Sequence, residues 1–293
     1  MLVGLAMGAT VKIGHAVGGG DRRQAYLASQ LAADGCSVKI HALDPPDFLF
    51  PETIIFANDL ETALNQVDLC ILGLPATRDG KNLWAPTAQN PIPLAAIAET
   101  IDGQTDLCGG FISSDVAKAF PDRVLFDYTA TPAFARRNAH LTAEGALFYL
   151  IRALPKALSE SHIAITGYGA VARSLTRLLL RCGCSVSVFA RKTEAQKTAD
   201  SDGARGYDLN TLPILIDRFD ALINTVPAPI IDPCLPTAYP RIYCLELASA
   251  PGGFGPESPA EKASGIPGKF SPESAAAVIR DILYDHWKEG FYE

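Results

Sequence analysis

A short apolar run that leads into a glycine pattern constrains the fold of this chain more than any other feature. Residues 162–166 have the character of a buried strand, and Gly167, Gly169 and Ala172 follow as G-x-G-x-x-A, ahead of a helical stripe of leucines. The first glycine allows a tight turn, the second lets a pyrophosphate approach the backbone, and the small third residue lets helix and strand pack. The pattern predicts a Rossmann-type dinucleotide-binding unit, with a plain glycine turn as the alternative.

The end of the next predicted strand indicates which dinucleotide would bind. Residues 185–190 form that strand, Arg191 and Lys192 follow it directly, and no acid occurs before Glu194. NAD sites usually place an acid here to bind the ribose 2′-OH, whereas a basic residue accommodates the 2′-phosphate of NADP. The sequence therefore favours NADP over NAD, although both residues are also typical of solvated loops.

Two later turns complete the predicted cofactor site. Thr225 and Pro227 follow one predicted strand, and Gly252 and Gly253 follow another. Ligands of open α/β sheets bind beyond the carboxyl ends of the strands, so the first pair is expected to flank the nicotinamide ribose. The two glycines would let the backbone approach a flat ring, or serve as ordinary turn residues. The predicted cofactor-binding residues are Gly167, Tyr168, Gly169, Ala170, Val171, Arg191, Lys192, Thr225, Val226, Pro227 and Ser249.

Composition is that of an ordinary soluble enzyme. The chain has 293 residues, of which 48% are hydrophobic and 19% charged, enough apolar material for two cores. The net charge of −7 argues against a general nucleic-acid surface. No apolar run is long enough to span a bilayer, and Met1 to Ala9 lack the basic start of a signal peptide. Seven scattered cysteines indicate buried thiols, with neither a disulfide framework nor a metal site, and favour the cytoplasm.

The first half of the chain alternates strands and helices without the fingerprint. The predicted strands cover residues 11–17, 37–42, 68–74, 106–111 and 123–126, which implies a mostly parallel sheet. The glycine run Gly18 to Gly20 has Arg23 where a small residue is required, so this half is expected to bind substrate. Arg23 could hold a carboxylate through two parallel hydrogen bonds, while Asp21 could simply cap the helix.

Two apolar helices are predicted to join the halves. Residues 142–158 carry apolar side chains at helical spacing, and residues 271–293 open on Ser-Pro and carry a second stripe. We expect the last helix to return to the first domain. The prediction is an α/β fold of two Rossmann-like doubly wound parallel-sheet domains with a ligand cleft between them. Residues 1–140 with 271–293 would form the substrate side, and residues 141–270 the Rossmann NAD(P)-binding domain.

An ordered set of short motifs resembles the A-subunit family of dipicolinate synthase. The motifs are Gly19-Gly20-Asp21 with Arg23-Gln24, Asn138 with Thr142-x-Glu144-Gly145, Gly167-x-Gly169, Ala190-Arg191, Ile223-Asn224-Thr225-x-Pro227, Leu247-Ala248-Ser249-x-Pro251-Gly252-Gly253 and Gly265-x-Pro267-Gly268. They span nearly the whole chain in the order expected for the family. The chain departs from the pattern at Ala250, where the family often has Arg, and in the loop after Gly268.

The resemblance implies oxidation of a dihydro- or tetrahydrodipicolinate to dipicolinate (pyridine-2,6-dicarboxylate) in sporulation, with a flavoprotein-like second subunit as partner. We also expect a homo-oligomer. The predicted catalytic residues are Arg23 as carboxylate anchor, Asn138 and Thr142 as hydrogen-bond donors, and Glu144 as proton acceptor. Glu144 could instead stabilise the first turn of a helix beginning near Thr142. If the family arginine absent at Ala250 binds a carboxylate, Lys269 or Arg23 would replace it.

Other functions compete with this one. A D-2-hydroxyacid dehydrogenase needs a histidine base after the cofactor domain, and only His286 lies there, inside the predicted last helix. A shikimate-type dehydrogenase shares Asn224-Thr225-x-Pro227 but needs a Lys–Asp pair, and the loop at Lys81 is unlike that motif. A non-catalytic nucleotide-binding assembly protein stays open because of Ala250.

Overall fold

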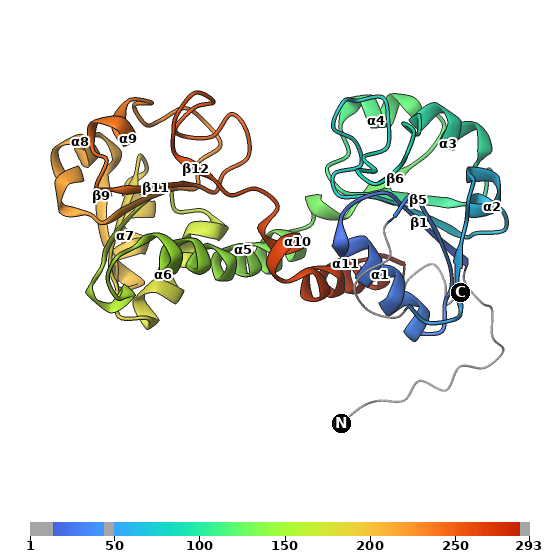
Figure 1. The fold of residues 1–293 in the computed structure, drawn as a ribbon, viewed down its shortest axis with the longest axis horizontal. Helices are drawn as coiled ribbons and strands as arrows, with labels where there is room; N and C mark the ends of the chain where they lie inside the picture. The colour runs from blue at the N-terminus through green and yellow to red at the C-terminus, as the bar shows by residue number, and fades with distance from the viewer. Residues whose placement is uncertain (1–13, 44–49, 288–293) are drawn as a thin grey trace. The chain divides into compact units, whose positions relative to one another are not determined.

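The computed structural model describes residues 14–43 and 50–287, which separate into two compact units (Figure 1). Unit 1 comprises residues 1–134 and 272–293, and unit 2 comprises residues 135–271. The first residues of the predicted strand 11–17 and the last of the predicted helix 271–293 lie outside the described residues. The assignment of substrate to unit 1 and cofactor to unit 2 stays a prediction.

Unit 1 is built on a parallel sheet of six strands within the described residues, in the order β3-β2-β1-β4-β5-β6. Its strands are β1 (Gly14–Gly18), β2 (Ser37–His41), β3 (Ile54–Phe56), β4 (Leu69–Leu72), β5 (Asp106–Gly109) and β6 (Leu125–Asp127). Its helices are α1 (Arg22–Ala33), α2 (Leu60–Leu64), α3 (Leu94–Thr100), α4 (Ser114–Ala119), the 3₁₀ turn η1 (Tyr128–Ala130) and α11 (Pro272–Trp287).

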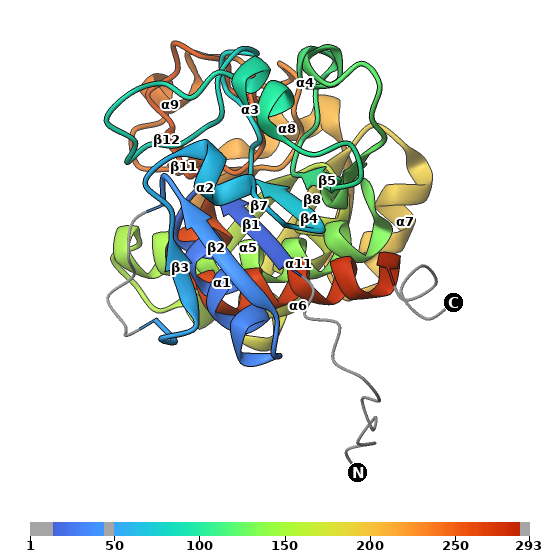
Figure 2. The ribbon, with the colours of Figure 1, turned by 90° about the vertical axis from the view of Figure 1, so that its right-hand side faces the viewer.

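The last helix completes unit 1 although it is far away in the sequence. In both views α11, in red, runs alongside α1, in blue (Figures 1 and 2), and the two helices are in contact. The apolar side of α11 is buried, with Ala275, Val278, Ile279, Ile282 and Leu283 all covered. Each such side chain contributes on the order of 1–3 kcal/mol of hydrophobic stabilisation. The return of the last helix to the first sheet follows from this apolar stripe.

Unit 2 repeats the architecture. Its six strands within the described residues are all parallel, in the order β12-β11-β10-β7-β8-β9. They are β7 (His162–Thr166), β8 (Ser185–Ala190), β9 (Arg205–Asp208), β10 (Ala221–Asn224), β11 (Tyr243–Glu246) and β12 (Glu261–Lys262). The helices are α5 (Pro132–Ala153), α6 (Ala170–Arg181), α7 (Thr193–Ser201), α8 (Leu212–Leu215), α9 (Leu235–Ala238) and α10 (Ile266–Phe270), with the 3₁₀ turns η2 (Leu158–Glu160), η3 (Leu209–Thr211) and η4 (Ile216–Arg218).

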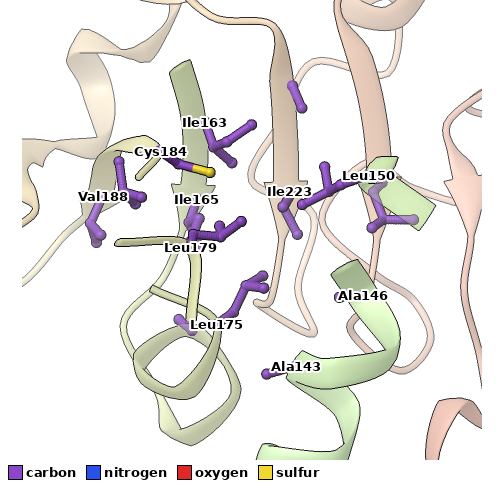
Figure 3. Close-up of a cluster of buried hydrophobic side chains, with 14 of the residues drawn as sticks. Ala143, Ala146, Leu150, Ile163, Ile165, Leu175, Leu179, Cys184, Val188 and Ile223 are labelled. Atoms are coloured by element: carbon purple, nitrogen blue, oxygen red, sulfur yellow. The ribbon is translucent and has the colours of Figure 1, made fainter. Parts of the chain in front are cut away.

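One apolar core of unit 2 lies between its sheet and the helices α5 and α6. Figure 3 shows strand residues such as Ile165 and Ile223 beside Leu175 and Leu179 of α6, with Leu150 of α5 nearby. All of these side chains are fully buried. This packing explains why a helical stripe of leucines follows the glycine pattern in the sequence.

Helix α5 corrects the predicted helix 142–158, because it begins at Pro132 and ends at Ala153. The Oγ1 atom of Thr131 accepts the N–H of Phe134 at 3.1 Å, and Pro132 is favoured at a first helical position. Among residues 132–140 the buried apolar side chains are Phe134 and Ala139, which are five positions apart, so helical periodicity alone missed these turns. The helix ends shortly before Pro155, since a proline disfavours helical geometry in the residue before it.

Both sheets have the same order when each is counted from its own first strand. That order, 3-2-1-4-5-6, is typical of doubly wound dinucleotide-binding sheets. The predicted α/β fold with two Rossmann-like parallel-sheet domains is therefore confirmed. Within residues 14–43 and 50–287, no helix has the length and apolar character needed to cross a membrane.

Candidate dinucleotide site

A cavity of about 380 Å³ lies at the carboxyl ends of the strands of unit 2. In the sheet order, β7 and β10 are neighbours at the point where the order of the strands reverses, which makes this edge the topological switch point. The cavity is lined by Gly167, Tyr168, Phe189, Ala190, Arg191, Lys192, Ala195, Leu209, Val226, Ala228 and Ile230. Ligands of open α/β sheets bind at such points, so this cavity is the candidate site.

Some of the predicted cofactor residues line this cavity and others do not. Those that line it are Gly167, Tyr168, Arg191, Lys192 and Val226. The remaining predicted residues, which lie at the start of α6 or in the turns after β10 and β11, are Gly169, Ala170, Val171, Thr225, Pro227 and Ser249. Sequence reasoning missed the apolar lining, such as Phe189, Leu209 and Ile230. Their only signal is position at or after a strand end.

The two fingerprint glycines serve different purposes. Gly167 has φ +83°, its N–H donates to the carbonyl of Phe189 at 2.9 Å, and a Cβ there would lie 2.6 Å from Val226 Cγ2. The protein's own packing thus requires glycine at 167. Gly169 is the N-cap of α6, has an ordinary extended conformation, and a Cβ there would meet no atom within 4 Å. The space ahead of the helix is open, and free N–H groups at a helix N-terminus favour an anion.

Charged groups at the cavity have the sign expected for a phosphate ligand. Arg191 and Lys192 are exposed, and none of the described residues that line the cavity is acidic. An acid that binds the ribose 2′-OH, as usual in NAD sites, is therefore not among them. This arrangement suits a ligand that carries a phosphate group.

Tyr168, between the two glycines, is fixed in place through its hydroxyl group. Its hydroxyl donates to Asp202 Oδ2 at 2.7 Å, and Arg177 pairs with the same carboxylate at 3.3 Å. Burial raises the pKa of the Tyr168 phenol, and its hydrogen bond lowers the pKa of Asp202, with Arg177 acting in the same direction. The tyrosine ring is thus a fixed wall of the cavity.

A row of three buried polar side chains lies beneath the turns of the site. Thr166, Asn224 and Glu246 are the last residues of β7, β10 and β11, and the strand register places Asn224 beside each of the other two. The Thr166 hydroxyl donates to Asn224 Oδ1 at 2.6 Å, and Asn224 Nδ2 donates to Glu246 Oε1 at 2.6 Å. We call Thr166, Asn224 and Glu246 the polar row. Sequence reasoning missed Glu246, whose signal is an acid inside an otherwise apolar strand.

The polar row also holds the turn after β11. Glu246 Oε1 accepts the N–H of Ala248 at 2.9 Å, and Oε2 accepts those of Gly253 at 2.7 Å and Phe254 at 3.2 Å. Gly252 has φ +73°, and a Cβ there would lie 2.7 Å from Glu246 Oε2. A Cβ at Gly253 would collide with Asn224. These two glycines therefore let the backbone of the turn pass close to the polar row.

In unit 1, Arg23 is already engaged. Its Nε and Nη2 donate to Asp21 at 2.9 and 2.7 Å, and Nη2 also reaches the carbonyl of Leu74 at 3.4 Å. Asp21 accepts the backbone N–H of Arg23 as well, so it is both the helix cap and the ion-pair partner. The Nη1 atom makes no hydrogen bond to the residues that the structure describes. Any substrate carboxylate bound by Arg23 would meet this remaining edge.

The other predicted catalytic residues share one helix of unit 2. Thr142 is buried, and its hydroxyl donates to the carbonyl of Asn138 at 2.8 Å, within α5. Glu144 is exposed, and its Oε1 lies 3.2 Å from His140 Nε2. Because α5 begins at Pro132, Glu144 is in mid-helix, and the alternative that it stabilises a first turn is wrong. Arg23 belongs to unit 1 and these three residues to unit 2.

His286 lies in the last helix, within unit 1. The His286 ring stacks on Phe126, with centroids 3.6 Å apart, as part of the packing of α11 in unit 1. That position does not suit the histidine base of a D-2-hydroxyacid dehydrogenase. Within the described ranges, no group of three or more His, Cys, Asp or Glu side chains is arranged to hold a metal ion.

Two doubly wound units, one with an open switch point, define a two-domain α/β fold of the kind that binds dinucleotides. Residues 15–125 match the family model of the N-terminal domain of the dipicolinate synthase A-subunit. The resemblance that the ordered motifs predicted is thus confirmed, and the chain is similar to the dipicolinate synthase A-subunit. No curated protein matches the sequence.

Solved structures share the whole fold at low identity. The A chain of dipicolinate synthase from Bacillus subtilis is 22% identical, with a TM-score of 0.80 over 96% of this chain and 97% of that chain. The dipicolinate synthase A-subunit from Bacillus halodurans is 20% identical, with a TM-score of 0.81 over 95% and 99%. A transhydrogenase from Sinorhizobium meliloti is 14% identical, with a TM-score of 0.65 over 94% and 93%. These likenesses extend over both units of the chain.

Proposed function

We propose that this chain oxidises a dihydrodipicolinate to dipicolinate with NADP⁺ as the hydride acceptor. The observation that carries the proposal is the joining of two parts in one chain: residues 15–125, which match the N-terminal domain of the dipicolinate synthase A-subunit, and a second unit with an open dinucleotide pocket. A tetrahydrodipicolinate would need two such oxidations, and NAD⁺ is the alternative acceptor.

Different residues of unit 2 would bind different parts of the dinucleotide. The pyrophosphate would bind at the N-terminus of α6, where Gly169 leaves open space. The adenosine would enter the cavity, with its 2′-phosphate near Arg191 and Lys192. The nicotinamide ribose would contact the turn at Thr225 to Pro227, and Ser249 would lie beside it. Each of these positions lies at the carboxyl edge of the sheet.

The reaction removes a hydride and a proton from the substrate ring. Dihydrodipicolinate and NADP⁺ give dipicolinate, NADPH and one proton, so no other oxidant is required. The dinucleotide supplies the site that accepts the hydride. We assign one substrate carboxylate to the Nη1 edge of Arg23, since guanidinium groups bind carboxylates well. We assign the proton to Glu144, whose neighbour His140 is a second group able to accept it.

Purified protein tests the proposal directly. Incubation with NADP⁺ and freshly prepared dihydrodipicolinate should produce pyridine absorbance and NADPH in equal amounts. Glu144→Gln should lower kcat more than it changes the Kd for NADPH, because the proposed role is proton transfer. Absence of turnover with NADP⁺ and with NAD⁺, alone and with a flavoprotein-like second subunit, would overturn the proposal.

The proposal extends to the setting of the enzyme. We infer that it acts in the cytoplasm of sporulating cells, as a homo-oligomer, with a flavoprotein-like second subunit as partner. Deletion of its gene in a sporulating host should give spores without dipicolinate, and light scattering should give a mass above 31.2 kDa for the purified chain. Spores with normal dipicolinate, or a monomer mass, would contradict the corresponding part.

A non-catalytic nucleotide-binding protein is the second candidate. It is favoured by the engagement of Arg23 with Asp21, by the Thr142 hydroxyl donating within its own helix, and by Ala250 in place of the family arginine. This candidate predicts tight NADPH binding together with no turnover under any of the conditions above.

A further inference from the structure

Glu246 is a buried carboxylate that has hydrogen-bond donors but no cation. Its side chain belongs to a residue only 6% exposed, and it accepts N–H groups from Asn224, Ala248, Gly253 and Phe254. Within the described residues, no Lys or Arg side chain bonds to it. Burying a charge is costly unless it is fully hydrogen-bonded, and an apolar residue would avoid that cost. The N–H groups that converge on Glu246, and not an ion pair, therefore offset the cost of burying it.

The polar row is connected to the cavity through backbone groups. Asn224 Oδ1 accepts the N–H of Val226 at 3.1 Å, and Asn224 Nδ2 donates to the carbonyl of Val226 at 2.9 Å. Glu246 accepts the N–H of Gly253, and the carbonyl of Gly253 in turn accepts the N–H of Ile230 at 3.1 Å. Val226 and Ile230 both line the cavity. A change at Glu246 therefore reaches the cavity wall through one turn.

We propose that Glu246 is the positioning residue of the dinucleotide site. It acts through the turns after β10 and β11, which it holds in one arrangement before the ligand arrives. The inference rests on the proposed function, since it assumes that unit 2 binds NADP. A preformed site spends less binding free energy on ordering its loops, so loss of this anchor weakens binding.

Glutamate suits this place better than its close analogues. A carboxylate has two oxygens that only accept, enough to take all of the N–H groups that converge here. Glutamine would direct an NH₂ group at one pair of these donors and leave buried N–H groups without acceptors. Aspartate lacks the length to reach Gly253 and Asn224 together.

The test compares Glu246→Gln with Glu261→Gln. Glu261, in β12 of the same sheet, bonds to Arg152 and accepts the Tyr243 hydroxyl at 2.6 Å, and it does not line the cavity. Both variants lose a carboxylate that is hydrogen-bonded in unit 2, so Glu261→Gln controls for general destabilisation. NADPH titrations are run well below each melting temperature, where all of the protein is folded, with hydrogen exchange of the backbone amides measured alongside.

We expect Glu246→Gln to raise the Kd for NADPH about tenfold, equivalent to about 1.4 kcal/mol, and Glu261→Gln to leave it within about twofold. Exchange should become faster at Ala248, Gly253 and Phe254 in Glu246→Gln alone. If Glu246→Gln does not fold, Thr166→Val, which removes only the hydroxyl at the other end of the polar row, should raise the Kd about threefold.

The outcomes separate the inference from the function on which it rests. Normal NADPH affinity in folded Glu246→Gln, or in Thr166→Val where that variant replaces it, would overturn the positioning role while leaving the cofactor assignment intact. An equal loss of affinity in Glu261→Gln would also overturn it, because the effect would then be general. Wild-type protein that binds neither NADPH nor NADH would overturn both.

Discussion

The two units have the same strand order, but they differ in the turn between the first strand of the sheet and the helix that follows it. α1 and α6 each have 12 residues and follow the first strand of their sheets. In each unit a glycine before the helix donates its N–H to the end of the adjacent strand, Gly19 to His41 and Gly167 to Phe189. The residue two positions after this glycine is the N-cap of the helix. It is Asp21 in unit 1 and Gly169 in unit 2.

The N-cap residue and the covering of the turn by other residues together determine whether the helix N-terminus can accept a ligand. In unit 1 the Asp21 carboxylate occupies the N-terminus of α1, and the backbone of Gly20 donates to the carbonyl of Trp84 at 2.7 Å. A Cβ at Gly19 would lie 2.7 Å from the same carbonyl, so the chain itself covers this turn. In unit 2 the space at Gly169 is empty of protein atoms. Strand order thus supplies the location, whereas an uncapped and uncovered helix supplies the site.

Placing the N-cap aspartate of unit 1 at the corresponding position of unit 2 should have the largest effect on NADPH binding. Gly169→Asp places a carboxylate where we expect the pyrophosphate, and like charges repel strongly in this partly enclosed site. We expect the Kd for NADPH to rise about 100-fold, equivalent to about 2.8 kcal/mol. The free energy of unfolding should rise by a few tenths of a kcal/mol, since Asp is a better cap than Gly. Fluorescence titration and urea denaturation measure the two quantities.

Gly169→Asn is the matched control, because asparagine caps the helix without a charge. It should weaken NADPH binding much less than Gly169→Asp does. Equal effects of the two variants would mean that side-chain bulk, and not charge at the helix N-terminus, decides binding.

The second prediction concerns the basic turn that unit 2 has after β8. Arg191→Ala should raise the Kd for NADPH about tenfold while changing that for NADH by less than about twofold, because a charge-assisted bond to the 2′-phosphate is lost. Arg181→Ala, an exposed arginine at the other end of α6, should change neither. A parallel loss of NADPH and NADH affinity in Arg191→Ala would remove the preference for NADP.

The third prediction is that opening the cap of unit 1 does not create a site. Asp21→Asn keeps a helix cap but removes the charge that holds Arg23, so the free energy of unfolding should fall by about 1 kcal/mol. Because Trp84 and Leu83 still cover Gly19, calorimetry should show the same number of NADPH molecules per chain as in the wild type. Asp59→Asn, at the exposed cap of α2, should lower the free energy of unfolding less than Asp21→Asn does. A second bound nucleotide in Asp21→Asn would show that charge alone had closed unit 1.

Features encoded over short stretches were predictable from the sequence. β7 and β8 match the predicted runs at 162–166 and 185–190 because a continuous apolar run, a nearby glycine and a following helix all agree there. The start of α5 at Pro132 was missed because its first turns carry no apolar stripe. In these cases the outcome depended on whether local pattern and tertiary packing pointed the same way.

Features that depend on pairing between distant segments were not predictable. Glu246 acquires its role only through the strand register that sets it beside Asn224. Arg23 was expected as an available anchor, yet Asp21 two positions earlier binds it, and the sequence could not distinguish a cap from a ligand-binding acid. The apolar lining of the cavity, such as Leu209 and Ile230, comes from separate turns that only the fold brings together.

The smallest expected effect is on stability and concerns Tyr168. This residue of unit 2 stands at the position of Gly20 in unit 1. Tyr168→Phe removes a hydrogen bond that lowers the pKa of Asp202 below its ordinary 3.8, so the variant's carboxyl pKa should rise. A carboxyl with a depressed folded pKa contributes stability above its ordinary pKa and loses it as the pH falls through the folded value. The variant should therefore be less stable than the wild type near pH 7, by at most about 1 kcal/mol after solvent screening, and this difference should shrink below about pH 4. Urea midpoints across that range measure it, and a difference that stays constant with pH would mean that the Tyr168 hydroxyl contributes to stability without acting on the Asp202 carboxylate.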